Sequence, residues 1–204
     1  MLNSIRKPVV VVNIILVVLE LIALIHDMYA FKFGLFEWYT VDSNVLQMIV
    51  SALVVMYCYC GKAIPKVVTI LHFITAVGLT VTFLIAAFVL APEGGVAYYF
   101  IQNVAPINHL IAPILSVLSL LFLEKVEKLP LKIILYPACA TLFYGIMCLI
   151  LNALRIMDGP YFFLKVYEQT VGTIVLWFVI IAVLCLVLAF VYYRVKWRRR
   201  CFHL

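Results

Sequence analysis

Charged residues are scarce in this chain. Only 12% of its 204 residues are Asp, Glu, Lys or Arg, and only nine of these are acidic. A soluble domain carries about 25% charged residues, so the composition excludes that class, and the few charges also exclude a disordered chain. Gly and Pro number eight each, too few for a collagen-like or low-complexity chain. Apolar residues are abundant instead, at 68%, with a mean hydropathy of +1.21. The composition therefore indicates an integral membrane protein.

Long apolar runs divide the chain into candidate membrane spans. A bilayer core about 30 Å thick needs roughly 20 residues of helix at 1.5 Å per residue. Charges and turn residues separate six such runs, at approximately residues 8–28, 39–60, 67–91, 103–123, 131–153 and 171–193. No connecting segment is long enough to form a second domain. We therefore expect an all-α fold, a polytopic six-transmembrane-helix bundle in which residues 1–204 form a single membrane domain.

The basic residues predict the orientation of this bundle. Twelve of the 15 Lys and Arg residues fall in the two tails and in the second and fourth connections, whereas Lys32, Arg155 and Lys165 lie on the other side. By the positive-inside rule, both termini are expected in the cytoplasm of a multi-pass protein of the cell membrane. The basic C-terminal tail then serves as a topology signal and a contact for anionic lipids, so no nucleic-acid partner is expected.

Neither metal nor disulfide chemistry is indicated by the cysteines. None of the six lies in a segment predicted to face outward, so no disulfide framework is expected. Cys58 and Cys60 are only two residues apart and have no partner His or Cys at a zinc-ligand spacing. We therefore expect no metal and no cofactor.

Polar residues inside the predicted spans carry the functional signal, because each is costly unless it faces the bundle interior or a wet cavity. Counting the helical rise from the inner boundary places Glu20, His109 and Tyr144 in one layer. Asn44 lies just above that layer, whereas His72 lies near the inner end and is expected to be a packed histidine. Four spans each carry a polar stripe at helical spacing: Asn13, Glu20 and Asp27; Thr40, Asn44, Gln47 and Ser51; His109, Pro113 and Ser116; and Tyr144, Cys148, Asn152 and Arg155. We expect these stripes to face one central cavity that opens to the outer side.

Three segments resemble a known family. Residues 38–47, WYTVDSNVLQ, resemble the YxT…Q/SN signature that opens the second span of the androgen-induced-protein family. Residues 108–113, NHLIAP, resemble the family's histidine-then-proline helix, and residues 158–164, DGPYFFL, resemble the aromatic-Pro-Phe-Leu stretch before its last span. The segments occur in the family's order. The family joins animal membrane proteins that react with serine-hydrolase probes to small six-helix bacterial relatives.

Animal members of this family are threonine hydrolases of fatty acid esters of hydroxy fatty acids. The resemblance implies that Thr40 is the nucleophile and His109 the general base, and Asn152 stands roughly where animal members carry a further histidine. Such a pair is chemically coherent, because a threonine hydroxyl needs a neighbouring base and histidine titrates near neutral pH.

Supporting groups can be named from the polar stripes. An acid that orients the histidine is expected to be Glu20, by depth, or Asp42, by sequence. Tyr144 or Asn44 is expected to donate a hydrogen bond to the developing oxyanion.

Structural roles are the alternative for each candidate. Thr40 then caps the second helix, His109 is an interior histidine bonded to Glu20 or to a backbone carbonyl, and Glu20 only holds helices together. Asp42 is expected to form a structural ion pair with Arg155.

Two function classes follow. The first is a membrane-embedded hydrolase of acyl-ester lipids, whose partner is a membrane lipid or a lipid-like substrate. The second is a non-enzymatic lipid or small-solute carrier or binding protein, in which Glu20, Asp27 and His109 form a proton relay. Six helices are few for a carrier, and the polar stripes of the first three do not recur in the last three, which favours the hydrolase.

Overall fold

The chain is all-helical in the computed structural model, which describes residues 6–198 and contains no strand within them. Arg199 and Arg200 of the basic tail lie outside the described residues. The long helices are α1 (Lys7–Phe31), α2 (Tyr39–Tyr59), α3 (Lys66–Ile85), α7 (Leu135–Ala153) and α8 (Val171–Arg198). The short ones are η1 (Lys32–Glu37), η2 (Ala86–Leu90), α4 (Ala91–Gly94), α5 (Val96–Phe100), η3 (Ile107–Ile111), α6 (Ala112–Leu118), η4 (Ser119–Leu123), η5 (Leu131–Ile134) and η6 (Phe162–Leu164).

Five helical segments are long and apolar enough to cross a membrane, which agrees with five of the six expected spans. They are Lys7–Glu37, Tyr39–Tyr59, Lys66–Gly94, Leu131–Ala153 and Val171–Trp197. The fourth expected span, 103–123, is a shorter apolar helix over Ile107–Leu123. Its start is delayed because residues 101–104 form turns and a bend in which Asn103 adopts a positive φ of 50°. Pro106 lies in the first helical turn, where its missing N–H costs no intrahelical bond. The count of six spans therefore stays a prediction.

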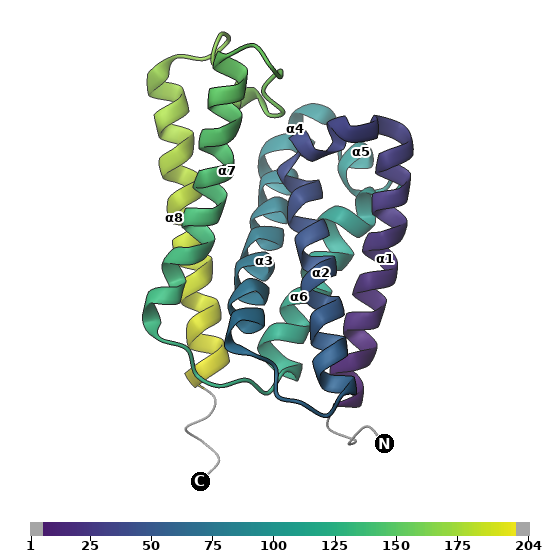
Figure 1. The fold of residues 1–204 in the computed structure, drawn as a ribbon. Helices are drawn as coiled ribbons and strands as arrows, with labels where there is room; N and C mark the ends of the chain where they lie inside the picture. The colour runs from purple at the N-terminus through teal and green to yellow at the C-terminus, as the bar shows by residue number, and fades with distance from the viewer. Residues whose placement is uncertain (1–5, 199–204) are drawn as a thin grey trace.

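The helices form two groups that meet at α3. In Figure 1, α1, α2, α3 and α6 pack together, and α7 and α8 form an antiparallel pair on the other side of α3. Leu16, Leu79 and Ala112 join α1, α3 and α6 in one apolar layer. Phe73 of α3 and Trp197 of α8 belong to the largest apolar cluster, which joins the two groups. Figure 1 also shows that α1 begins and α8 ends at the same end of the bundle, which we call the terminal end.

A buried polar network lies near the terminal end. His72 is fully buried, as expected, but its Nδ1 lies 2.8 Å from Oε1 of Glu124. The hydroxyl of Ser119 donates to the same carboxylate oxygen at 2.8 Å, and Nδ2 of Asn13 donates to Ser119 at 2.6 Å. Lys196 donates to the backbone oxygen of Glu124 at 2.6 Å. The network therefore ties α1, α3, η4 and α8 together.

Glu124, just after η4, is the charged centre of this network. Burial raises its pKa, but the neighbouring His72, Ser119 and Lys196 outweigh burial and hold the pKa below its ordinary value. The carboxyl is therefore anionic at neutral pH, and its charge stabilises the folded protein.

Candidate functional site

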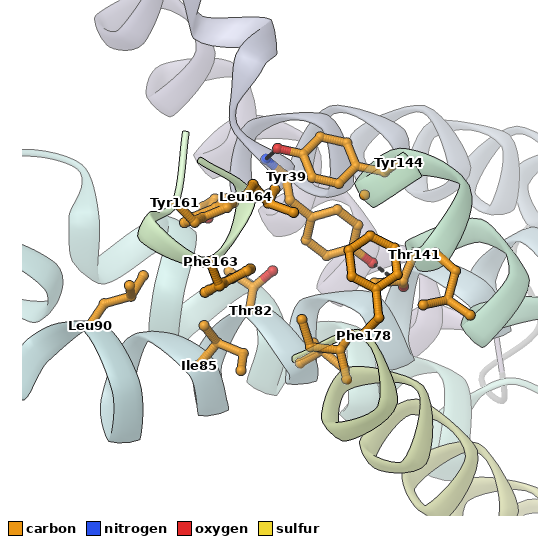
Figure 2. A pocket seen from close by; sticks show the side chains of 15 residues that line it. Tyr39, Thr82, Ile85, Leu90, Thr141, Tyr144, Tyr161, Phe163, Leu164 and Phe178 are labelled. Atoms are coloured by element: carbon orange, nitrogen blue, oxygen red, sulfur yellow. Dashed lines mark hydrogen bonds between the residues drawn. The ribbon is translucent and has the colours of Figure 1, made fainter. Parts of the chain in front are cut away.

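Two neighbouring cavities lie at the end of the bundle opposite the terminal end. The polar cavity, of about 180 Å³, is lined by residues of α1, α2, α5 and η3, among them His26, Asp27, Asn108 and His109. The apolar cavity, of about 60 Å³, lies between α2, α3, α7, η6 and α8. Figure 2 shows its lining, in which aliphatic and aromatic side chains surround the hydroxyl groups of Tyr39, Thr82 and Thr141. Thr40, Leu90 and Tyr161 line both cavities.

Thr40 lies in the first turn of α2, at the wall that the two cavities share. The N-cap residue of α2 is Trp38, and no side chain forms a cap hydrogen bond there. The alternative that Thr40 caps the helix is therefore wrong. The side chain of Thr40 is therefore not used to cap α2, and it borders both cavities.

His109 lies in the π-helical turn η3 and lines the polar cavity together with Thr40. The rings of Tyr99 and Phe100 contact it edge-on, with centroids 5.9 Å and 6.0 Å away. Within the described residues, neither Nδ1 of His109 nor either carboxylate oxygen of Glu20 has a hydrogen-bond partner. The expected bond between His109 and Glu20 is thus not formed. The imidazole instead interacts with the backbone of Ala105 and Tyr99, which agrees with the alternative of a backbone partner.

A chain of amide groups links the segments that carry the two candidate catalytic residues. Nδ2 of Asn44 donates to the backbone oxygen of Thr40 at 2.7 Å and to that of Asn108 at 3.3 Å. Nδ2 of Asn108 in turn donates to Oδ2 of Asp27 at 3.1 Å. Asn44 lines neither cavity, so it is not placed to contact an oxyanion. Its role is to hold the Thr40 turn against the turn that precedes His109.

Asp27 is the acid that the structure places in the site, where Glu20 or Asp42 had been expected. It is 6% exposed and lines the polar cavity with His109. Besides Asn108, its carboxylate contacts Nδ1 of His26 at 3.1 Å. Asp27 lies one heptad beyond Glu20 on the same buried stripe of α1, the spacing by which the sequence had placed it among the interior polar residues.

Tyr144 and Tyr161 both line the apolar cavity with Thr40, but the hydroxyl of Tyr144 is used by the backbone, whereas Tyr161 borders both cavities. The hydroxyl of Tyr144 donates to the backbone oxygen of Glu37 at 2.6 Å and accepts from the backbone N–H of Tyr39 at 3.0 Å, so it fixes the start of α2. Burial raises the pKa of Tyr161 to about 12, and its interaction with Thr40 opposes part of that shift. Its hydroxyl is therefore a neutral donor at physiological pH.

The loop that carries Tyr161 is held by close packing. A Cβ on Gly159 would lie 2.6 Å from the backbone oxygen of Leu164, so only glycine fits there. Tyr161 stacks on Phe163, with centroids 5.3 Å apart and 8° between the planes, and Phe163 stacks on Trp177 of α8. The segment 158–164 therefore contributes Tyr161 to the wall between the cavities.

The remaining candidates lie outside the site. Asp42 is half-buried and lines neither cavity, and within the described residues it forms no ion pair with Arg155. The guanidinium of Arg155 instead lies 4.8 Å from the centroid of the Tyr167 ring. Asn152 accepts from the N–H of Val166 at 2.7 Å and donates to the oxygen of Met157 at 3.0 Å, so it holds the loop after α7.

The fold and the site together define a helical membrane protein with two neighbouring cavities, one polar and one apolar, which share a wall at Thr40. In comparisons with known proteins, no family model, no curated protein and no solved structure matches the chain.

Proposed function

We propose that the protein is a membrane-embedded hydrolase of acyl-ester lipids, with Thr40 as nucleophile and His109 as general base. The observation that carries this proposal is the position of Thr40 on the wall shared by the apolar and polar cavities. A fatty acyl chain in the apolar cavity would bring its ester group to Thr40 and leave the alcohol half in the polar cavity. The resemblance of the segments around Thr40 and His109 to a threonine hydrolase family supports the same assignment.

The proposed reaction has two acyl-transfer steps. Oγ of Thr40 attacks the ester carbonyl carbon while His109 accepts the hydroxyl proton, and the hydroxyl of Tyr161 donates to the oxyanion. The carbon–oxygen bond to the alcohol then breaks, and His109 returns the proton to the leaving alkoxide. Water attacks the acyl-threonine ester in the second step. His109 takes a proton from that water and passes it to Oγ of Thr40, which releases the fatty acid.

The orientation in the membrane is part of the proposal. The terminal end carries most of the basic residues, so we place it in the cytoplasm with both termini, in a six-span protein of the cell membrane. The two cavities then open near the outer leaflet. The apolar cavity lies between α3 and the α7–α8 pair, where a lipid chain can enter sideways from the bilayer.

A carrier is the second candidate, and one observation favours it. Glu20 is 2% exposed with both carboxylate oxygens unpartnered among the described residues, as expected of a group that exchanges protons or solutes. However, the apolar layer of Leu16, Leu79 and Ala112 lies one helical turn closer to the terminal end. Beside that layer, however, buried hydrogen bonds run from Gln47 through Ser116 to His72, which contacts Glu124, so the layer does not exclude a polar path. The hydrolase is the stronger candidate because Thr40 lies on the wall that the two cavities share.

The deciding experiment is labelling of the purified protein with a fluorophosphonate probe, followed by mapping of the adduct by mass spectrometry. Thr40→Ala should lose the adduct, and His109→Ala should slow labelling about 10²- to 10⁴-fold, because the base no longer accepts the proton. The double variant should be no slower than the worse single variant. Thr69→Ala, which alters a buried threonine in the first turn of α3, is the matched control and should label normally. An adduct that persists in Thr40→Ala would refute the proposal.

A further inference from the structure

The polar cavity has a lining that is unusual for a site that binds a lipid ester. It combines one buried carboxylate, Asp27, with aromatic rings that include Trp38, Tyr98, Tyr99 and Tyr161. We propose that this cavity binds a quaternary ammonium group, so that the preferred substrates are fatty acyl esters of a choline-like alcohol. The catalytic part of this inference rests on the proposed hydrolase function, whereas the binding part does not.

The charge of the cavity favours a cation. No Lys or Arg is among the described residues that line it. The partners of the Asp27 carboxylate are the imidazole of His26 and the amide of Asn108. The other histidine that lines the cavity is His109. None of these is a permanent cation. A substrate carboxylate or phosphate in this cavity would lie near the Asp27 carboxylate, and no Lys or Arg of the lining would offset the repulsion between them. Binding of such a substrate is therefore disfavoured.

The aromatic rings favour a quaternary ammonium group over a primary amine. Trp38 and Tyr161 meet edge to face, with centroids 5.6 Å apart and 85° between planes, and Tyr98 and Tyr99 do the same at 5.0 Å and 85°. Perpendicular rings present walls in two directions, as in the aromatic cages that hold methylated ammonium groups. A trimethylammonium group has no N–H to satisfy, so ring faces and one carboxylate are sufficient to bind it.

The position of the cavity relative to the nucleophile completes the inference. Tyr161 is both part of the aromatic lining and a neighbour of Thr40 at the wall between the cavities. An ammonium group bound among these rings would be joined to the ester carbonyl by only a short linker. Choline has such a linker of two carbon atoms, whereas a second long acyl chain would have to fill a cavity that carries a buried charge.

The test compares two esters of one fatty acid. One is the choline ester, and the other is its neutral isostere, in which a tert-butyl group replaces the trimethylammonium group. The wild type should show a kcat/KM at least about 10-fold higher for the choline ester. In Asp27→Asn this ratio should fall toward one. Glu93→Gln, which removes an exposed acid of α4 outside the cavity lining, is the matched control and should keep the wild-type ratio.

Binding is measured separately, as the rise in Tm of the detergent-solubilised protein with tetramethylammonium chloride relative to sodium chloride. The wild type and Glu93→Gln should show the rise, and Asp27→Asn should not. If Asp27→Asn does not fold, Trp38→Leu serves in its place and should also lose the rise.

The outcomes separate the two proposals. Equal hydrolysis of both esters, or a wild type without a specific rise in Tm, would overturn the cation site. A protein that binds tetramethylammonium but hydrolyses neither ester would overturn the hydrolase and retain the site.

Discussion

Asn44 offers a test of whether the amide chain positions the reacting groups. The test depends on a matched partner, because Asn13 makes the same set of bonds at the other end of the bundle. Each donates from Nδ2 to the backbone oxygen four residues earlier, Asn44 at 2.7 Å and Asn13 at 2.9 Å. Each also donates to another helical segment, and each leaves its Oδ1 buried without a partner among the described residues. Asn44→Ala and Asn13→Ala therefore each remove two hydrogen bonds, although the second acceptor is the backbone oxygen of Asn108 for Asn44 and the Ser119 hydroxyl for Asn13. Only Asn44 links the segments that carry Thr40 and His109.

The magnitudes can be worked from these contacts. Two hydrogen bonds contribute about 1–3 kcal/mol together, whereas an unsatisfied buried oxygen costs about 1–3 kcal/mol. Each substitution removes the two stabilising hydrogen bonds and also the costly unsatisfied oxygen, so the two effects oppose each other. The free energy of unfolding should therefore change by less than about 2 kcal/mol, and by a similar amount in the two variants. A displacement of about 1 Å between reacting groups can cost about 10²-fold in rate, equivalent to about 2.7 kcal/mol in activation free energy. Asn44→Ala should therefore lose about 10²-fold in kcat/KM while Asn13→Ala keeps its activity.

Both quantities are measurable on the detergent-solubilised protein. Unfolding in sodium dodecyl sulfate gives the stability, and hydrolysis of a fluorogenic acyl ester, or the rate of fluorophosphonate labelling, gives the activity. Equal activity of the two variants would refute the positioning role of Asn44. A loss of activity that merely follows the loss of stability in both would refute it as well.

Three further predictions concern other parts of the bundle. The pKa of Glu124 is held below its ordinary value of about 4.5, so the stability that its charge contributes is fully present above that pH. This stability is lost as the pH falls through the lower pKa of the folded state. Acid unfolding should show the loss, and Glu124→Gln should abolish it. Glu20→Leu removes an unpartnered buried carboxyl and should raise the free energy of unfolding by about 1–3 kcal/mol, so a destabilised variant would show that the carboxyl has a partner. A Cβ on Gly145 would lie 2.9 Å from Cζ of Phe178 in the wall of the apolar cavity, so Gly145→Leu should shift ester hydrolysis toward shorter acyl chains; an unchanged chain-length profile would place the acyl chain elsewhere.

The helices could be predicted from the sequence because hydropathy and length dictate them. Four expected spans agree with helices in the structure to within four residues at each end, and the first, 8–28, lies within the longer helical segment Lys7–Glu37. A run of about 20 apolar residues has few alternatives in a bilayer. The fourth helix starts later than expected because residues 101–104, among them Asn103 with a positive φ, form turns and a bend. Local backbone geometry decides that boundary, and hydropathy does not report it.

The site was only partly predictable, for a different reason. Helical spacing placed Thr40 and His109 on interior faces, and the structure puts both at one cavity. Tyr144 also lines the apolar cavity, but its hydroxyl bonds the backbone at the start of α2, which the sequence pattern does not report. Tyr161 lies in a loop, where no periodicity reports which way a side chain points, so only the tertiary packing could show that it borders both cavities.

The bond between Asn13 and Ser119 has a consequence for how the protein is made. The two residues are 106 positions apart, so α1 leaves the ribosome and meets the translocon long before its partner is synthesised. During that interval the amide of Asn13 and the carboxyl of Glu20 must be tolerated by lipid or translocon. Insertion scales assign about −0.3 to −0.6 kcal/mol to each large aliphatic residue, so the lipid-facing residues of α1 must offset these polar groups. Val11 and Ile14 are exposed in the finished bundle. Such side chains favour membrane insertion of α1 although they add little to the packing of the bundle.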